Sequence, residues 1–220
     1  MIDLFNYPGD ALAKLADNDR LRNVEDLELC SAGKSPASVR AFFDGPAAAS
    51  LVRLQCGALD SVELAALAGT RTASRLRYLR LYFESADPVT DPLFTAERFP
   101  RLRWLDLSGS VVASGERLGE DTVQRLITGP ADTPLRRLDL SWCRLTDVGA
   151  EQLAAWPGLA KLRWLDLDSN LIRNAGFLAL ARSPHTSNLE CLKVDGFWLR
   201  DLPKVKAELD ARFGKVIDYG

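Results

Sequence analysis

Apolar residues recur along most of this chain in the pattern Leu-x-x-Leu-x-Leu, in which the x positions are usually polar or charged. Seven segments carry the pattern, and they begin at Val24, Leu51, Leu76, Leu102, Leu135, Leu162 and Leu189. The steps between these first positions are 27, 25, 26, 33, 27 and 27 residues. Seven matches at a nearly constant period predict a repeat architecture in which each unit stacks on the next.

The spacing within each unit predicts its local structure. Alternation of apolar and polar residues is typical of a short, half-buried strand, with the leucines pointing inward. Apolar helical stretches follow several strands, for example over residues 64–68, 149–155 and 176–181. Stacked units pair their strands in parallel and share one core. Because helices are wider than strands, we expect an α/β solenoid with a parallel β-sheet on its concave face and helices or irregular segments on its convex face.

Two stretches carry a family resemblance. Residues 138–150 (LDLSWCRLTDVGA) and 165–170 (LDLDSN) resemble the ribonuclease-inhibitor-like class of leucine-rich repeats. In that class an Asn or Cys at the turn after the strand hydrogen-bonds neighbouring backbone, and Cys143 and Asn170 occupy this position. Other residues replace it in the remaining repeats, namely Ala32, Leu59, Glu84, Ser110 and Phe197. The resemblance therefore implies a leucine-rich-repeat horseshoe whose N-terminal half is less regular.

Residues 153–192 are also similar to bacterial leucine-rich-repeat proteins that carry a separate N-terminal repeat-companion domain, and we recognise no such domain in this sequence. We expect one leucine-rich-repeat domain over 1–220, with an N-terminal capping segment over 1–23 and about seven repeats over 24–201. A C-terminal capping helix and short strand occupy 202–220.

The two ends of the chain predict how the stack is covered. Asp10 is a suitable N-cap for a short helix over 11–16. Residues 203–213 form an amphipathic pattern ended by Gly214. Residues 216–219 then predict a truncated eighth strand, because Val216 lies 27 residues after Leu189. The fourth repeat is about six residues longer than the others, which predicts a longer convex loop with a short helix over 121–128, or a protruding loop that contacts a partner.

The residues between the inward leucines form columns along the sheet, one residue per repeat. The third-position column reads Asp26, Arg53, Tyr78, Trp104, Arg137, Trp164 and Cys191. We expect the Arg137 guanidinium to stack between the indoles of Trp104 and Trp164, because cation–π contacts of this kind are favourable even on a surface. Aromatic and arginine side chains are also enriched at binding hot spots. The column is therefore either a protein-binding strip or a set of side chains that merely cover the sheet.

The fifth-position column contains Asp106, Asp139 and Asp166, and the seventh position adds Asp168 and Asp195. Like charges on neighbouring strands repel, so nearby cations must compensate them. We expect this from Arg103, Arg136, Arg137 and Arg163, with Arg80 and Lys193 at the ends of the column. Three interpretations stay open: solvated or salt-bridged residues, a docking site for a basic partner, or a divalent-cation site at Asp166, Asp168 and Asp195.

Composition and motifs narrow the function. The formal net charge is -2, which gives no electrostatic reason to expect nucleic acid or an anionic membrane as partner. No targeting segment or run of 18 apolar residues occurs. Four cysteines far apart in sequence, Cys30 and Cys191 on outward positions among them, indicate reduced thiols in a cytoplasmic protein. His185 is the single histidine, and no nucleotide, zinc or triad motif accompanies it. We therefore expect no catalytic residue, cofactor or metal.

The sequence favours a non-catalytic module that binds another protein through the concave face, and a basic surface on that partner is one of the interpretations that the aspartates leave open. The candidate contacts are Tyr78, Trp104, Arg137, Trp164, Asp106, Asp139, Asp166, Asp168 and Asp195. The alternative is a regulator or inhibitor of a partner enzyme, as in ribonuclease inhibitors and GTPase-activating proteins of this fold, in which an exposed arginine such as Arg117 would matter more than the strip.

Overall fold

A computed structural model describes residues 2–3, 11–29, 35–57, 59, 61–81, 96–109, 123–124, 126–127 and 133–219. Its strands form one sheet in which every neighbouring pair is parallel and the strand order equals the sequence order. The strands are β1 (Ile2–Asp3), β2 (Asp26–Leu29), β3 (Arg53–Cys56), β4 (Tyr78–Leu81), β5 (Trp104–Asp106), β6 (Arg137–Asp139), β7 (Trp164–Leu167), β8 (Cys191–Val194) and β9 (Ile217–Asp218).

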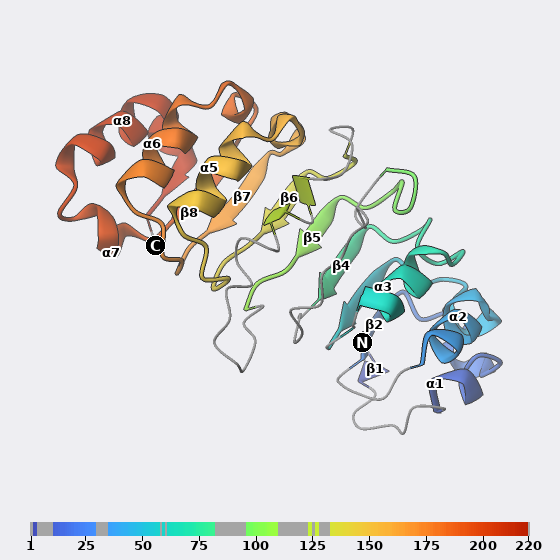
Figure 1. Cartoon of the computed structure of the whole chain (residues 1–220). Coiled ribbons are helices and arrows are strands. Elements are labelled where there is room, and N and C mark those ends of the chain that lie inside the picture. Colours follow the sequence, from blue (N-terminus) through green and yellow to red (C-terminus); the bar gives the residue numbers. More distant parts are fainter. Residues whose placement is uncertain are drawn as a thin grey trace.

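The helices lie along one face of this sheet (Figure 1). They are α1 (Ala11–Lys14), α2 (Pro36–Asp44), α3 (Ser61–Ala68), α5 (Asp147–Ala155), α6 (Asn174–Arg182), α7 (Gly196–Leu199) and α8 (Pro203–Phe213). Short 3₁₀ helices add η1 (Asp19–Leu21), η2 (Pro46–Ala48), η3 (Pro157–Lys161), η4 (Pro184–Thr186) and η5 (Gly214–Val216). We call the opposite face of the sheet, which carries the third- and fifth-position columns, the open face. The parallel sheet with helices on one face fits the expected α/β solenoid.

The register confirms the repeat alignment. The inward leucines pair in sequence, as in Leu105 with Leu138 and Leu138 with Leu165, and all three are fully buried. They join the helices in one continuous core. Because each strand from β2 to β8 has only three or four residues, its leucines are buried only by stacking on the next repeat.

Local signals set the helix boundaries. Ser35 is the N-cap of α2, its hydroxyl accepts from the backbone N–H of Ser38, and Pro36 occupies the first turn. Helix α8 spans Pro203–Phe213 as the amphipathic pattern predicts, and Gly214 follows it with φ of 53°. A left-handed residue of this kind favours glycine, which carries no Cβ.

Both ends of the sheet differ from the expectations. Residues 2–3 form β1, which pairs with β2 and was not predicted. Helix α1 covers Ala11–Lys14, shorter than the expected 11–16, and Asp10 lies outside the described residues. At the other end, β9 pairs Ile217 with Leu192. The expected alignment of Val216 with Leu189 is therefore wrong by two residues, because one 3₁₀ turn leads directly from α8 into the strand. The division into capping segments and repeats stays a prediction.

The third repeat and the longer fourth repeat fall mostly outside the described part of the chain. Of the expected helix over 121–128, the described residues Val123, Gln124, Leu126 and Ile127 are helical.

Candidate functional site

The third-position column lies on the open face in the predicted order. Asp26, Arg53, Tyr78, Trp104, Arg137, Trp164 and Cys191 pair one after another across β2 to β8. Neighbouring strands are about 4.8 Å apart, so side chains on adjacent strands of this column are within reach of each other.

The contacts begin at the N-terminal side of the column. Arg53 forms an ion pair with Asp26, with 3.3 Å between Nε and Oδ2, and its guanidinium carbon lies 4.3 Å from the centre of the Tyr78 ring. Tyr78 in turn packs edge-to-face against Trp104, with ring centres 4.9 Å apart. Such aromatic pairs stabilise by about 0.5–1.5 kcal/mol beyond the area they bury. The column is thus organised before any partner binds.

The expected double stack of Arg137 is only half correct. Its guanidinium carbon lies 5.2 Å from the centre of the Trp104 ring, and no described contact joins it to the Trp164 ring in the same way. The two indoles instead approach each other directly, with ring centres 6.3 Å apart. Tryptophan rings are long enough to meet across an intervening strand, which leaves the Arg137 side chain exposed to solvent. The cation that lies over the Trp164 ring is Lys193, at 5.6 Å.

The aspartate column is stabilised differently from the expectation. Asp106 Oδ1 accepts from the backbone N–H and the hydroxyl of Ser108, at 3.0 and 2.7 Å. Asp139 accepts the same two bonds from Ser141, at 3.0 and 2.7 Å. Asp166 accepts from the N–H of Asp168 at 3.0 Å. Each carboxylate therefore closes the turn after its own strand.

The cations at the ends of the column contribute as predicted. Arg80 lies 3.6 Å from Asp106, and Lys193 lies 3.7 Å from Asp166. The expected contribution of Arg103, Arg136 and Arg163 is wrong, because these side chains lie at the other end of the strands. Arg103 and Arg136 donate to backbone carbonyls there, and Arg163 forms an ion pair with Glu190.

Burial changes the ionisation of this column. Burial raises the pKa of Asp139 above its ordinary value, and the charge of Asp106 raises it further. The two hydrogen bonds from Ser141 lower the pKa, but by less than burial raises it. Burial also raises the pKa of Asp166. Burial and the charge of Asp106 raise the pKa of Tyr78 to about 12, so its hydroxyl stays protonated and donates to Asp106 Oδ2 at 3.2 Å. The charges of the column are therefore costly to hold on the protein alone.

Exposure divides the candidate residues into two groups. Tyr78 and Asp106 are only 6% and 5% exposed, and Asp166 is similarly buried. Arg137 is exposed, and the others are half-buried: Trp104, Trp164, Asp139, Asp168 and Asp195. The first group positions its neighbours, while the second is accessible to a partner.

The three aspartates considered for a cation do not gather. Asp195 is the N-cap of α7 and accepts from the N–H of Phe197 at 2.8 Å, whereas Asp168 accepts from the Ser169 hydroxyl. No group of three His, Cys, Asp or Glu side chains in the described residues could hold a metal ion.

Asn170 and Cys143 link the turns after β7 and β6 to the backbone of the preceding repeat. Asn170 is buried, and its Oδ1 accepts from the N–H groups of Cys143 and Leu145 one repeat earlier. Cys143 is also buried, and its thiol donates to the Leu107 carbonyl at 3.2 Å. Both residues therefore bridge neighbouring repeats at the predicted turn position. Phe197, at the corresponding position, lies in α7 and is exposed.

Sequence reasoning missed Trp142. Its side chain is 64% exposed and its φ is 59°, in the left-handed region. Gly109 occupies the same place in the preceding repeat, with φ of 70°. Ser169 occupies the same place in the following repeat, with φ of 54°, so the left-handed conformation recurs at this turn of the repeat and is costly for a bulky residue such as Trp142. The glycine one repeat earlier was the signal in the sequence that could have identified this position.

Several other expectations fall outside the described residues. They include Arg117, the exposed arginine of the regulatory alternative, and Cys30, which the pattern places on an outward position. Cys191 lies on β8 with a partly buried thiol, and burial raises the pKa of this thiol. His185 lies in η4, between α6 and β8.

A leucine-rich-repeat family model matches residues 131–154. This stretch spans β6 and all but the last residue of α5, which together make one repeat of the stack. The match supports a leucine-rich-repeat protein. None of the curated proteins compared with the chain matches it. In the part of the chain that the structure describes, no helix is both long and apolar enough to cross a membrane.

Proposed function

We propose that this chain is a non-catalytic protein-interaction module that holds a partner protein on its open face. The open face is then the concave face of a horseshoe, because helices packed side by side need about 8–10 Å each and strands only about 4.8 Å. The observation that carries the proposal is the continuous chain of ring and guanidinium contacts from Arg53 to Trp164.

Preorganisation is what makes this strip suitable for binding. Side chains that are already fixed lose little rotamer freedom when a partner docks, a cost of about 0.5–1.5 kcal/mol for each side chain that must be immobilised. Trp104 and Trp164 are held by each other, and Arg137 lies over one of them while remaining exposed. Tryptophan and arginine are the residue types that most often dominate binding energy.

The aspartate column determines the charge of the partner. Asp139, Asp168 and Asp195 are half-buried and keep accessible surface beside the aromatic strip. Burial raises the pKa of Asp139, so a cation brought close to it relieves an unfavourable desolvated charge. A partner with a basic surface fits this face. Trp142, at the end of β6, is a further candidate contact on its rim.

Affinity capture from a native lysate, followed by mass spectrometry, tests the proposal. We expect Trp164→Ala and Asp139→Lys to lose the captured partner while the circular dichroism spectrum stays unchanged. Val62→Ala and Val62→Lys are matched controls, because Val62 is exposed on α3, among the helices opposite the open face. If both face variants still capture the partner as the wild type does, the open face is not the binding face.

A further inference from the structure

A row of arginines precedes the strands on four consecutive repeats. Arg77, Arg103, Arg136 and Arg163 each occupy the second position of their repeat, and we call this set the arginine ladder. The backbone links them directly: Arg103 N–H donates to the Arg77 carbonyl, Arg136 to Arg103 and Arg163 to Arg136, at 2.8–2.9 Å. Their Cα atoms therefore repeat at about the strand spacing of 4.8 Å, a distance at which like charges repel.

Carboxylates neutralise only one end of the arginine ladder. Arg163 forms an ion pair with Glu190. Arg103 donates to the Pro134 carbonyl at 3.1 Å, and Arg136 donates to the Leu135 carbonyl at 2.8 Å. Within the described residues, the exposed Arg77 side chain makes no hydrogen bond or ion pair. Carbonyl groups fix the direction of a guanidinium but do not neutralise its charge. Within the described part of the chain, no carboxylate therefore forms an ion pair with Arg77, Arg103 or Arg136.

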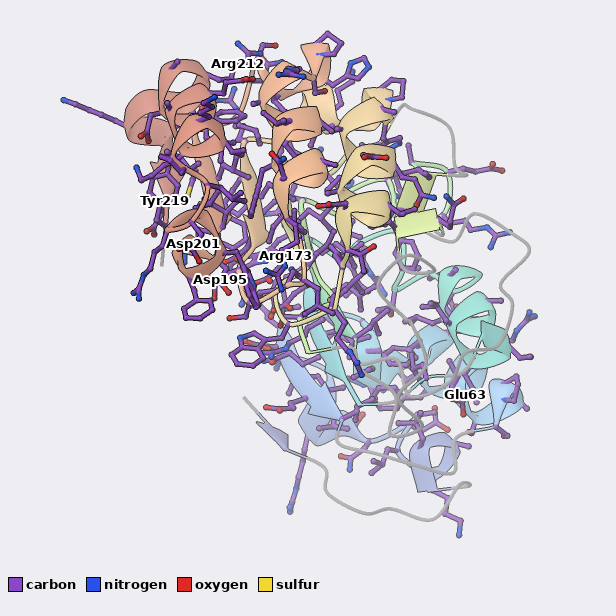
Figure 2. The ribbon with its side chains drawn as sticks, turned by 60° about the vertical axis from the view of Figure 1, so that its left-hand side comes forward. Glu63, Arg173, Asp195, Asp201, Arg212 and Tyr219 are labelled. Atoms are coloured by element: carbon purple, nitrogen blue, oxygen red, sulfur yellow. The ribbon has the colours of Figure 1, made fainter. Side chains whose placement is uncertain are left out.

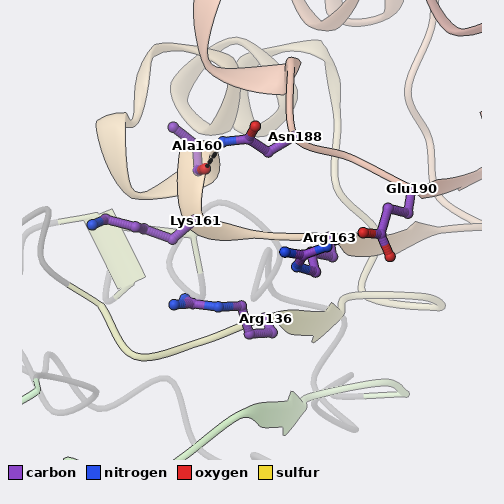
Figure 3. Close-up of a pocket in the computed structure, with 6 residues that line it drawn as sticks. All are labelled: Arg136, Ala160, Lys161, Arg163, Asn188 and Glu190. Carbon is purple, nitrogen blue, oxygen red and sulfur yellow. Dashed lines mark hydrogen bonds and ion pairs between the residues drawn. The ribbon is translucent and has the colours of Figure 1, made fainter.

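A polar hollow of about 330 Å³ opens beside the arginine ladder (Figure 3). It is lined by Arg136, Ala160, Lys161, Arg163, Asn188 and Glu190. The lining carries three cations and one carboxylate. Figure 3 shows Arg136 and Arg163 directly before β6 and β7, Lys161 in η3, and Glu190 directly before β8. A hollow with this surplus of positive charge suits an anionic group.

The arginine ladder lies at the opposite end of the strands from the aspartates. Position two and position five are three residues apart, which is about 10 Å along a strand. In Figure 2, Arg212 of α8 lies on one side of the C-terminal repeats and Asp195, which follows β8, lies on the other. The arginine ladder and the aspartate column thus lie at opposite ends of the strands, with Arg80 and Lys193 beside the aspartates and Glu190 beside Arg163.

We infer that the arginine ladder is a second interaction surface, and that its ligand is an acidic segment of a protein, rich in Asp and Glu. Guanidinium groups bind carboxylates in pairs of charge-assisted hydrogen bonds, and the ladder offers several in register. A protein segment can direct its carboxylates to this edge alone. A nucleic acid is negative along its whole length and would be repelled by the aspartate column and by a chain of net charge -2.

Fluorescence anisotropy with a labelled ten-residue glutamate peptide tests this inference on the full chain. A decathymidylate and a ten-residue lysine peptide serve as comparison probes. The test variant is Arg77→Glu with Arg103→Glu. Arg77→Glu alone is a second variant that should leave the fold intact, because the Arg77 side chain makes no described hydrogen bond. The matched control is Lys204→Glu with Lys215→Glu, which changes the net charge by the same amount at exposed positions far along the chain.

We expect the glutamate peptide to bind, and its affinity to fall as salt rises from about 50 to about 200 mM. The double ladder variant should lose at least tenfold in affinity and the single variant several-fold, with the control pair within about twofold of wild type. No binding of the glutamate peptide, or equal losses in the ladder and control pairs, overturns the inference. Tighter binding of decathymidylate assigns the edge to nucleic acid instead.

Light scattering adds one further outcome. A dimer that disappears in Arg77→Glu would mean that a second copy of the chain occupies the edge, which also overturns the inference. The open-face variants Trp164→Ala and Asp139→Lys leave the arginine ladder intact, so this surface and the proposed function succeed or fail separately.

Discussion

Replacing Asn170 by alanine removes the side chain that joins two neighbouring repeats at one turn. Its carbonyl oxygen accepts two hydrogen bonds, from the N–H groups of Cys143 at 3.1 Å and Leu145 at 3.0 Å. Its amide nitrogen donates to the carbonyls of Leu140, Leu167 and Asp168, at 2.9, 2.9 and 3.2 Å. The residue is 3% exposed, so water does not replace these bonds while the turn keeps its shape.

The cost follows from the groups left behind. Two buried N–H donors lose their acceptor, and each unsatisfied group costs about 1–3 kcal/mol. Asn170→Ala should therefore lower the free energy of unfolding by about 2–6 kcal/mol, with about 4 kcal/mol at the centre of this range. This is a large share of the roughly 5–15 kcal/mol that is typical for a folded domain. Asn170→Cys should recover part of this loss, because the Cys143 thiol already donates to a carbonyl at the equivalent turn.

Urea titration followed by tryptophan fluorescence measures the loss as the change in midpoint multiplied by the slope. Asn188→Ala is the matched control, since Asn188 is exposed and makes one described hydrogen bond, to the Ala160 carbonyl at 2.7 Å. We expect the control to cost less than about 1 kcal/mol. An Asn170→Ala variant as stable as the control would refute the claim that this side chain fastens the repeats together.

Three further substitutions probe other parts of the structure. Trp142→Gly should leave the free energy of unfolding within about 1 kcal/mol of wild type. Glycine relieves the left-handed backbone strain of about 1–2 kcal/mol, but its greater flexibility in the unfolded chain offsets this gain. A loss of several kcal/mol in urea titration would contradict the exposed position of the Trp142 side chain. Asp139→Asn should stabilise the fold at neutral pH by about 0.2–1 kcal/mol. The pKa of Asp139 is raised in the folded state, so stability is lost as pH rises through it, and the advantage of the variant should vanish below the ordinary value of 3.8. Gly176→Ala should lower the free energy of unfolding by about 1–3 kcal/mol, because an added Cβ would lie 2.8 Å from Asp147 Oδ1. Gly69→Ala is the control, since its added Cβ would meet no atom closer than 3.6 Å, and its melting curve should stay near that of wild type.

The repeat alignment could be read from the sequence because a one-residue slip would turn every inward leucine outward. The penalty for such a slip is the exposure of buried side chains such as Leu138 and Leu165, so the register follows from the pattern. The same logic failed at the ends, where no further repeat demands a fixed spacing. β1 was missed, and β9 starts two residues away from the expected alignment.

The sequence also placed Trp104, Arg137 and Trp164 next to one another, because register alone decides which residues are neighbours on a sheet. It could not decide how their side chains pack. Rotamers place the two indoles against each other, and the guanidinium lies over only one of them. The partners of Asp106 and Asp139 likewise depend on short-range geometry, since Ser108 and Ser141 are two residues away and the expected arginines lie at the opposite edge.

The sequence by itself thus determined the repeat, the parallel order of the strands and the residues that share each column, because these follow from a period that burial enforces along the whole chain. Only the tertiary structure decided which members of a column are buried, which charges are neutralised, and that Trp142 is exposed on a strained turn. Those properties depend on distances between side chains of different repeats. A periodic pattern fixes which residues are neighbours, and the packing of each side chain then determines its exposure and its charge environment.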